Sequence, residues 1–396
     1  MSTSEPARGG AWQRAVLRDE GDAHRPVGWV ELFFDLVFVV IISVLAHDLE
    51  GSARADGILL FVLQFLAVFW VWNGFTYYTE RFESHGLENR LFTFLGILTV
   101  AGLAVWGEDG LGHNYPGFAA SFLLARGLNI AMWLRAGRHE PRFRRAAGGF
   151  TVGYLASAAL VGVSLVVDER WRLVLWGVAV LVDIASPAVT ARFQFGLPGI
   201  SRDKFPERFG LLTLIVLGEV VTSVIQGVAT ANEASEVSAS TILDASLGLT
   251  IGFGLWWVYF DFVARRATRP DFLIALVWVY LHIAMLIGIV LAGVAISGAL
   301  LAEDDAEPTR LLLLAIGATL LVIALLELTL DRAADEPTGA ILSPALKAAV
   351  GGAVLLLAPF SDHLPTTAAL VAGVVALAIP AAYGARVYYR RPAPRL

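Results

Sequence analysis

The chain has 396 residues, of which 57% are hydrophobic and only 16% are charged. A soluble domain usually carries about 25% charged residues, and one globular core cannot bury so many apolar side chains. The composition therefore excludes an ordinary soluble protein. Cysteine is absent, which excludes disulfides and thiol chemistry.

The apolar residues fall into repeated blocks of about 20, the length that crosses a bilayer as a helix. We predict an all-α, polytopic membrane bundle with no segment between spans long enough for a soluble catalytic domain. The twelve expected helices lie near residues 29–49, 56–79, 90–107, 117–136, 146–167, 171–192, 207–228, 239–264, 272–299, 309–330, 340–358 and 366–388.

Basic residues are distributed unevenly between these spans. With both termini in the cytoplasm, 24 of the 29 Lys and Arg residues fall on the cytoplasmic side and four on the outer side, while Arg126 lies within a span. Cytoplasmic loops carry the excess of Lys and Arg in membrane proteins. The distribution therefore supports both the number of spans and their orientation.

The two halves of the chain share a pattern. ELFFDLVFVV begins helix 1 at Glu31, ERFGLLTLIV begins helix 7 at Glu207, and both follow a basic segment. Helices 2 and 8 both end in Trp-rich segments with one polar residue, Asn73 or Asp261. Six helices per half is an even number, so the halves would form a parallel repeat. The alternative is that apolar helices resemble one another by composition alone.

The repeat defines the predicted organisation. We expect a cytoplasmic N-terminal tail at 1–28, a first six-helix repeat at 29–192, a cytoplasmic linker at 193–206, a second six-helix repeat at 207–388 and a cytoplasmic C-terminal tail at 389–396.

Four segments carry a family resemblance. ELFFDLVFV, ERFGLLTLIVLGE, WWVYFDF and YLHIAMLIGIV together resemble the bacterial low temperature requirement protein A (LtrA) family over essentially the whole membrane region. The resemblance implies a multi-pass protein of the bacterial plasma membrane that is linked by name to growth in the cold. It implies no particular substrate or reaction. More loosely, the acid-containing start of the first helix in each half is similar to the corresponding helices of lysosomal-type potassium channels. The Phe-Ser-Asp-Gly motif of those channels is absent here.

Three acids lie near helix starts. Glu31 and Glu207 stand in a first helical turn, where the helix dipole and free backbone N–H groups favour a carboxylate, so we interpret them as helix-start residues. Asp35 shares a face with Glu31 but lies one turn deeper, and we expect it to face the bundle interior. For Asn73 and Asp261 a structural role at the membrane interface is sufficient, because Asp261 can pair with Arg265 at i+4.

Four ionisable residues are expected deeper in the membrane. Glu219, Arg126 and Asp183 lie near the middle of helices 7, 4 and 6, and His282 lies within helix 9. A charge at this depth costs at least about 2.5–3.5 kcal/mol unless it is paired, hydrated or neutralised. Arg126 could pair with Glu219 or with Asp183, and His282 could titrate or be a hydrogen-bonded packing residue. The set is either an ion or substrate pathway or a static network.

These residues lead to two hypotheses of function. The first is a secondary transporter or ion-conducting protein of unknown substrate, and the alternative is a non-transporting membrane sensor or envelope factor that supports growth at low temperature. No Walker A loop and no zinc-ligand spacing occurs in the sequence. We therefore expect no cofactor and no metal. An enzyme within the membrane ranks third, because no nucleophile is paired with a base, and we expect no enzymatic activity. Topology explains the short basic groups without a nucleic-acid partner, so the expected partners are the lipid bilayer and an ion or small molecule.

Topology reporters test the predicted orientation. Fusions after residues 110, 170, 235 and 305 should report the outside, and fusions after residues 85, 140, 200 and 335 the cytoplasm, because the 24-to-four asymmetry of basic residues sets the orientation. A reproducible reversal at one site in the middle of the chain would contradict the twelve-span arrangement.

Overall fold

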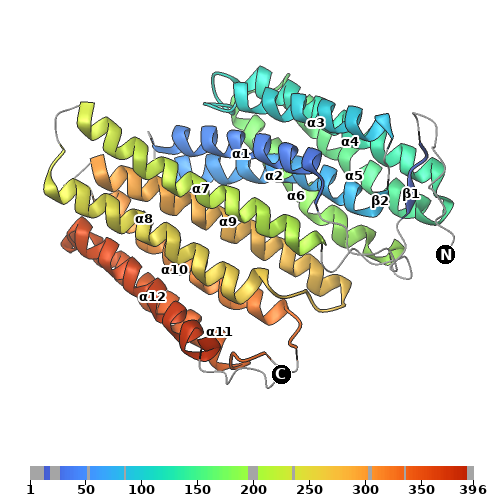
Figure 1. Cartoon of the computed structure of the whole chain (residues 1–396). Coiled ribbons are helices and arrows are strands. Elements are labelled where there is room, and N and C mark those ends of the chain that lie inside the picture. The colour runs from blue at the N-terminus through green and yellow to red at the C-terminus, as the bar shows by residue number, and fades with distance from the viewer. Residues whose placement is uncertain are drawn as a thin grey trace. The chain divides into compact units, whose positions relative to one another are not determined.

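A computed structural model of the chain confirms the all-α membrane architecture. The structure describes residues 13–17, 27–50, 54–83, 86–194, 204–233, 237–301, 306–333 and 336–389. Within these ranges twelve helices are long and apolar enough to cross a membrane, as predicted (Figure 1). Their bounds are α1 Trp29–Glu50, α2 Ala55–Arg81, α3 Leu87–Val105, α4 Tyr115–His139, α5 Arg144–Ser164, α6 Glu169–Thr190, α7 Lys204–Glu233, α8 Ala239–Tyr259, α9 Phe272–Leu301, α10 Ala306–Thr329, α11 Leu342–Leu357 and α12 Thr366–Tyr389.

The helix ends differ from the expected ones by a few residues, and some continue in tighter or wider turns. α8 runs into a π-helical turn at Phe260–Ala264 (η3), and 3-10 turns follow α4, α6 and α11. The only paired strands among the described residues are β1 Val16–Leu17 and β2 Phe82–Glu83, which join part of the predicted N-terminal tail to the end of α2. The rest of that tail before residue 27, and most of the predicted linker and C-terminal tail, lie outside the described residues.

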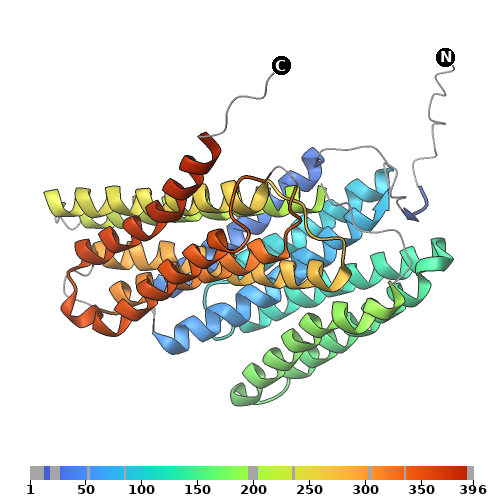
Figure 2. The same ribbon diagram turned by 90° about the horizontal axis from the view of Figure 1, so that it is seen from below.

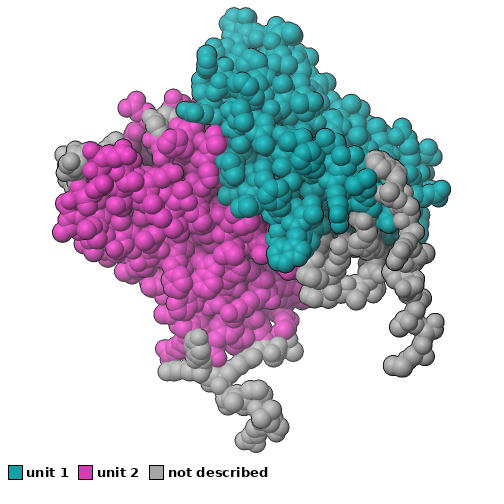
Figure 3. Space-filling model, turned by 45° about the horizontal axis from the view of Figure 1, so that its top comes forward, with its two compact units in different colours: residues 1–41, 63–205 teal, residues 42–62, 206–396 magenta. Residues whose placement is uncertain are grey.

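The chain divides into two compact units. Unit 1 comprises residues 1–41 and 63–205, and unit 2 comprises residues 42–62 and 206–396 (Figure 3). The division lies close to the predicted boundary between the halves, except that the end of α1 and the start of α2 belong to unit 2. The internal repeat itself stays a prediction.

Small residues allow close helix packing in unit 1. α5 and α6 run side by side in two views of the structure (Figures 1 and 2). A Cβ added to Gly149 would lie 2.5 Å from Thr190, and one added to Gly153 would lie 2.5 Å from Ser186 Oγ. Helices in a membrane associate where such small residues let backbones approach. These glycines therefore hold α5 against the polar face of α6.

Unit 2 is built around α9, α10 and α11. Gly317 of α10 and Gly351 of α11 meet backbone to backbone, since a Cβ added to either would lie 2.7–2.8 Å from the carbonyl oxygen of the other. Against the start of α9, the ring of Phe209 from α7 packs on Trp278 with centroids 4.8 Å apart.

Candidate functional site

The first buried ionisable group is the ion pair of Arg126 and Asp183 in unit 1. Both residues are fully buried, and the guanidinium Nη2 of Arg126 donates to Asp183 Oδ2. Ser157 Oγ donates to the same oxygen at 2.9 Å. Arg126 Nη1 donates to the carbonyl oxygen of Trp70 at 3.3 Å. Of the two partners that the sequence left open for Arg126, Asp183 is therefore the one that accepts its hydrogen bond.

Further polar side chains surround this pair. Asn129 follows Arg126 by one turn of α4, and Ser186 follows Asp183 by one turn of α6; their exposed fractions are 0% and 7%. A Cβ added to Gly74 of α2 would lie 2.7 Å from Asn129 Nδ2 and 3.1 Å from the Tyr154 hydroxyl. We call Arg126, Asn129, Tyr154, Ser157, Asp183 and Ser186 the first-unit cluster.

Five polar atoms of the first-unit cluster have no hydrogen-bond partner among the described residues. They are Arg126 Nε, both amide atoms of Asn129, Asp183 Oδ1 and Ser186 Oγ. A buried donor or acceptor without a partner costs about 1–3 kcal/mol. The sequence placed Arg126 and Asp183 in the membrane but missed Asn129 and Ser186, whose only signal is their one-turn spacing from the charged residues.

The second group surrounds Glu219 in unit 2. Glu219 is the 16th of the 30 residues of α7 and is 6% exposed. Its Oε2 accepts a hydrogen bond from Ser43 Oγ of α1. Within the described part of the chain, Glu219 forms no ion pair within 4.0 Å, and the charged groups that act on it are Glu50 and His47. Glu219 is thus a deep acid whose one hydrogen-bond donor is a neutral hydroxyl.

Ser43, His47 and Glu50 form a stripe on α1. Their spacing of i, i+4 and i+7 places them on one helix face. His47 is largely exposed, with 72% of its side chain accessible, while the Glu50 side chain is 17% exposed, and the two are 3.4 Å apart. The stripe therefore leads from an exposed helix end to the buried carboxyl of Glu219.

His282 lies buried in α9 with hydrogen-bond partners on both sides of its ring. It is fully buried, its Nδ1 lies 2.8 Å from the carbonyl oxygen of Trp278, and its Nε2 lies 3.1 Å from the Tyr259 hydroxyl. A carbonyl oxygen only accepts, so Nδ1 carries the proton and the neutral ring accepts from Tyr259 at Nε2. Both ring nitrogens are thereby satisfied, and the structural interpretation of His282 explains its position.

The residues near helix starts have local partners. Asp35 is fully buried and accepts from Trp72 Nε1 of α2 at 2.7 Å, so it faces the interior as expected. Glu31 Oε2 accepts from the backbone N–H of Gly28 at 3.0 Å, as a residue of the first helical turn does in a capping box. Glu207 is exposed in the first turn of α7.

The polar ends of helices 2 and 8 are also accounted for locally. Asp261 pairs with Arg265 at 3.0 Å and accepts from Trp257 Nε1 at 2.7 Å, which agrees with a structural role. Asn73 is half-buried in α2, beside the fully buried Trp72.

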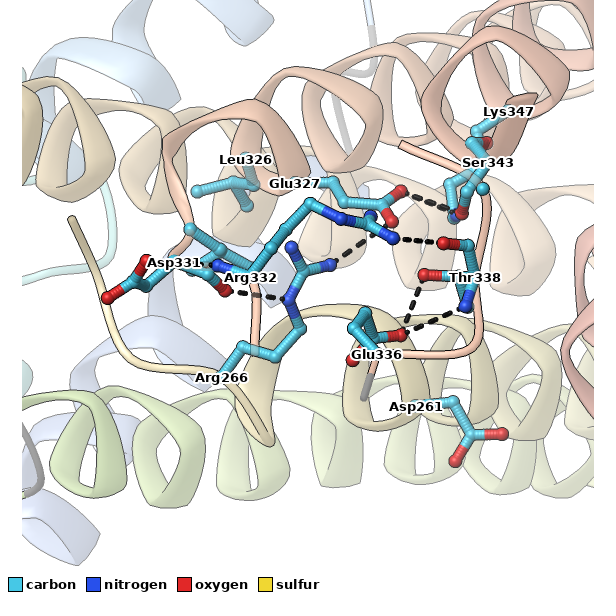
Figure 4. A network of polar contacts seen from close by, with 12 residues as sticks. Asp261, Arg266, Leu326, Glu327, Asp331, Arg332, Glu336, Thr338, Ser343 and Lys347 are labelled. Atoms are coloured by element: carbon cyan, nitrogen blue, oxygen red, sulfur yellow. Dashed lines mark hydrogen bonds and ion pairs between the residues drawn. The ribbon is translucent and has the colours of Figure 1, made fainter. Parts of the chain in front are cut away.

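A third group, around Glu327 and Lys347, was missed by the sequence analysis. Lys347 Nζ lies 2.9 Å from Glu327 Oε2, and Arg266 Nη1 lies 3.2 Å from Glu327 Oε1. Ser343 Oγ donates to Glu327 at 2.9 Å and accepts from Lys347 at 2.8 Å (Figure 4). The Phe262 ring faces the Lys347 ammonium, with 3.4 Å between Nζ and the ring centroid. We call Arg266, Glu327, Ser343 and Lys347 the second-unit cluster.

The second-unit cluster continues into the loop after α10. Arg332 donates to the carbonyl oxygen of Thr338, and the Thr338 hydroxyl donates to Glu336 at 2.7 Å (Figure 4). Lys347 was counted with the cytoplasmic basic residues because it lies near a helix start, yet its side chain is fully buried. The sequence offers one sign that Lys347 is unusual, because only two of the 29 basic residues are lysines.

Neither cluster is a metal site by composition. Among the described residues no group of three or more His, Cys, Asp or Glu side chains could hold a metal ion. The first-unit cluster has one carboxylate beside one guanidinium, and the second has one carboxylate between two cations. Their chemistry is therefore hydrogen bonding and charge pairing.

Comparison with known proteins gives the family. A model of the bacterial low temperature requirement A protein (LtrA) matches residues 26–379, which is most of the chain. The chain belongs to the LtrA family. This LtrA protein is also 25% identical over 297 residues to a protein of Rhizobium meliloti (strain 1021) described as uncharacterized, with 70% of each chain covered. No solved structure matches it.

A double-mutant cycle tests the ion pair of this LtrA protein. Arg126→Gln and Asp183→Asn should each lower the free energy of unfolding by about 3–5 kcal/mol, because each leaves a buried charge without its partner. The double variant should lose less than the sum of the two. Thermal unfolding in detergent measures this, with Asp261→Asn at a half-exposed ion pair as the control. Single variants as stable as the parent would contradict a buried charged pair.

The second-unit cluster makes an asymmetric prediction. Glu327→Gln removes the only carboxylate between Arg266 and Lys347, so stability should fall by about 3–5 kcal/mol. Lys347→Met should cost less, because Arg266 and Glu327 still neutralise each other and a Met side chain can pack on the Phe262 ring. The same thermal measurement compares them. Equal losses for both variants would mean that charge balance does not determine the stability of this cluster.

Proposed function

We propose that this LtrA protein is a non-enzymatic secondary transporter or ion-conducting protein of the bacterial plasma membrane, in which Glu219 exchanges a proton or a monovalent cation. The observation that carries the proposal is a carboxyl at the middle of a membrane-spanning helix whose hydrogen-bond donor is Ser43 and which forms no ion pair among the described residues.

The depth of Glu219 limits its chemistry. At a rise of 1.5 Å per residue it lies about 21 Å from either end of α7. An ionised carboxylate there is costly without a counter-charge. Arg126, which the sequence offered as that counter-charge, donates to Asp183 instead. Glu219 is therefore suited to hold a proton or a cation, and intramembrane acids of this kind mark proton relays and ion pathways.

The stripe on α1 gives Glu219 a route to water. Ser43 touches the carboxyl, His47 is one turn further along, and Glu50 is 3.4 Å from His47 at the exposed end of the helix. Each of these groups can donate or accept hydrogen bonds. A proton or hydrated cation would reach Glu219 along this face.

The proposed duplication supports a transporter design. Ser43 and Glu219 are 176 residues apart, the same offset as Glu31 and Glu207. Under the proposed duplication the two residues are counterparts, and their contact lies within unit 2. The last helix of each half also contains one internal proline, Pro187 or Pro380. Binding at the interface of repeats is common in secondary transporters.

A second function is favoured by the family description. The name of the LtrA family refers to a requirement at low temperature, which fits a membrane sensor or envelope factor that supports growth in the cold. Such a protein would need stable packing and would not need a titratable group at position 219. Flux and growth measured on the same variant separate the two functions.

The test replaces Glu219 by Gln. Glu219→Gln keeps the shape and the bond to Ser43 but cannot release a proton, so flux should fall by about tenfold or more if ionisation is required. Purified protein in liposomes, assayed with proton, sodium and potassium gradients, measures the flux. Glu207→Gln, an exposed acid on the same helix, is the matched control and should keep parental flux.

Stability and cold growth complete the experiment. Glu219→Gln should accumulate and unfold like the parent protein, because Glu219 forms no ion pair with any of the described residues. A variant with parental flux would refute the role of Glu219. Absence of flux in the parent protein, together with cold growth that survives Glu219→Gln, would favour the envelope factor.

A further inference from the structure

We propose that the first-unit cluster is a binding site for a small solute that has no net charge and carries both hydrogen-bond donors and acceptors. The proposal concerns α2, α4, α5 and α6 and does not depend on Glu219. It follows from a contrast between the two buried clusters of the protein.

The side chains of the second-unit cluster are hydrogen-bonded to one another. Glu327 accepts from Arg266, Ser343 and Lys347, and Lys347 donates to Glu327 and to Ser343. In the described part of the chain, none of these side chains has a buried polar atom without a partner. We therefore interpret this cluster as a structural network without a buried donor or acceptor left for a ligand.

The first-unit cluster has open atoms in a comparable setting. The four residues that carry them, Arg126, Asn129, Asp183 and Ser186, are each at least nine-tenths buried. Their five atoms without a partner among the described residues include both atoms of one carboxamide. Buried polar groups are almost always hydrogen-bonded, so a cluster of this kind is arranged for a group that the chain itself does not supply.

The helix spacing brings the open atoms together. Arg126 and Asn129 lie one turn apart on α4, and Asp183 and Ser186 lie one turn apart on α6, so each pair shares a face. The bond from Arg126 to Asp183 joins the two faces. Pro187 has no N–H, so the carbonyl oxygen of Asp183 receives no helical bond from it and adds an acceptor at the same level.

The charge balance determines the class of solute. Arg126 and Asp183 neutralise each other, so a solute with net charge would be buried without compensation. The open donors are Arg126 Nε–H and the Asn129 NH2 group, the open acceptors are Asn129 Oδ1 and Asp183 Oδ1, and the Ser186 hydroxyl can do either. A zwitterion or a small amide matches this set, whereas a simple cation or anion does not.

Cysteine labelling tests the proposal without assuming an activity, because the protein has no cysteine of its own. Ser186→Cys exchanges one atom in the first-unit cluster, and Asn129→Cys is a second reporter in case the first does not fold. Ser343→Cys, in the closed second-unit cluster, is the matched control. Membrane vesicles of both orientations receive 2-(trimethylammonium)ethyl methanethiosulfonate, which does not cross lipid, and the labelled fraction is followed by mass.

The first-unit reporter should be labelled on the order of tenfold faster than Ser343→Cys, because a site that exchanges solutes opens to water more often than a structural network. Glycine or acetamide should slow the labelling, and potassium chloride of equal osmolarity should not. Equal rates for the two clusters would overturn the site. Labelling that neither glycine nor acetamide slows, or that the salt alone slows, would overturn the class of solute.

Discussion

Hydrocarbon does not solvate a guanidinium, and an arginine cannot lose its proton inside a protein. Arg126, fully buried in α4, must therefore be surrounded by its own solvation shell of protein groups. Asp183 of α6 supplies the charge, the Trp70 carbonyl of α2 supplies an acceptor, and the Tyr154 ring of α5 lies 5.1 Å away. Solvating this one cation thus requires side-chain or backbone groups from four helices at the same depth. The glycines of α5 allow that helix to pack closely enough on α6.

The three buried groups differ in how completely they are satisfied. In the second-unit cluster, the ion pairs of Glu327 with Lys347 and Arg266 link α10 to α11 and to the turn after α8. The first-unit cluster is neutral but leaves donors and acceptors open. Glu219 has a hydroxyl partner and no cation within 4.0 Å among the described residues. The three groups thus show three degrees of satisfaction, and the proposed ligand binding and ion exchange rest on the two that are incompletely satisfied.

Hydropathy and span length predicted the twelve helices, because a bilayer imposes both on every spanning segment. Depth alone also identified Arg126, Asp183 and Glu219 as buried. The pairing of Arg126 required knowledge of which helices are neighbours, which one sequence does not contain. Lys347 was misread because a basic residue near a helix end usually extends toward the interface, whereas Glu327 and the Phe262 ring hold it inside.

The contact between Ser43 and Glu219 bears on how such a protein could arise. In a dimer of identical six-helix chains, the positions that correspond to Ser43 and Glu219 would be occupied by the same residue. Two glutamates there would repel each other at close range, and two serines would hold no charge. A fused gene removes this requirement for identity, so one half can provide the acid and the other its hydroxyl. In the proposed duplication, linking the halves would allow one carboxyl at a position where symmetry would impose two or none.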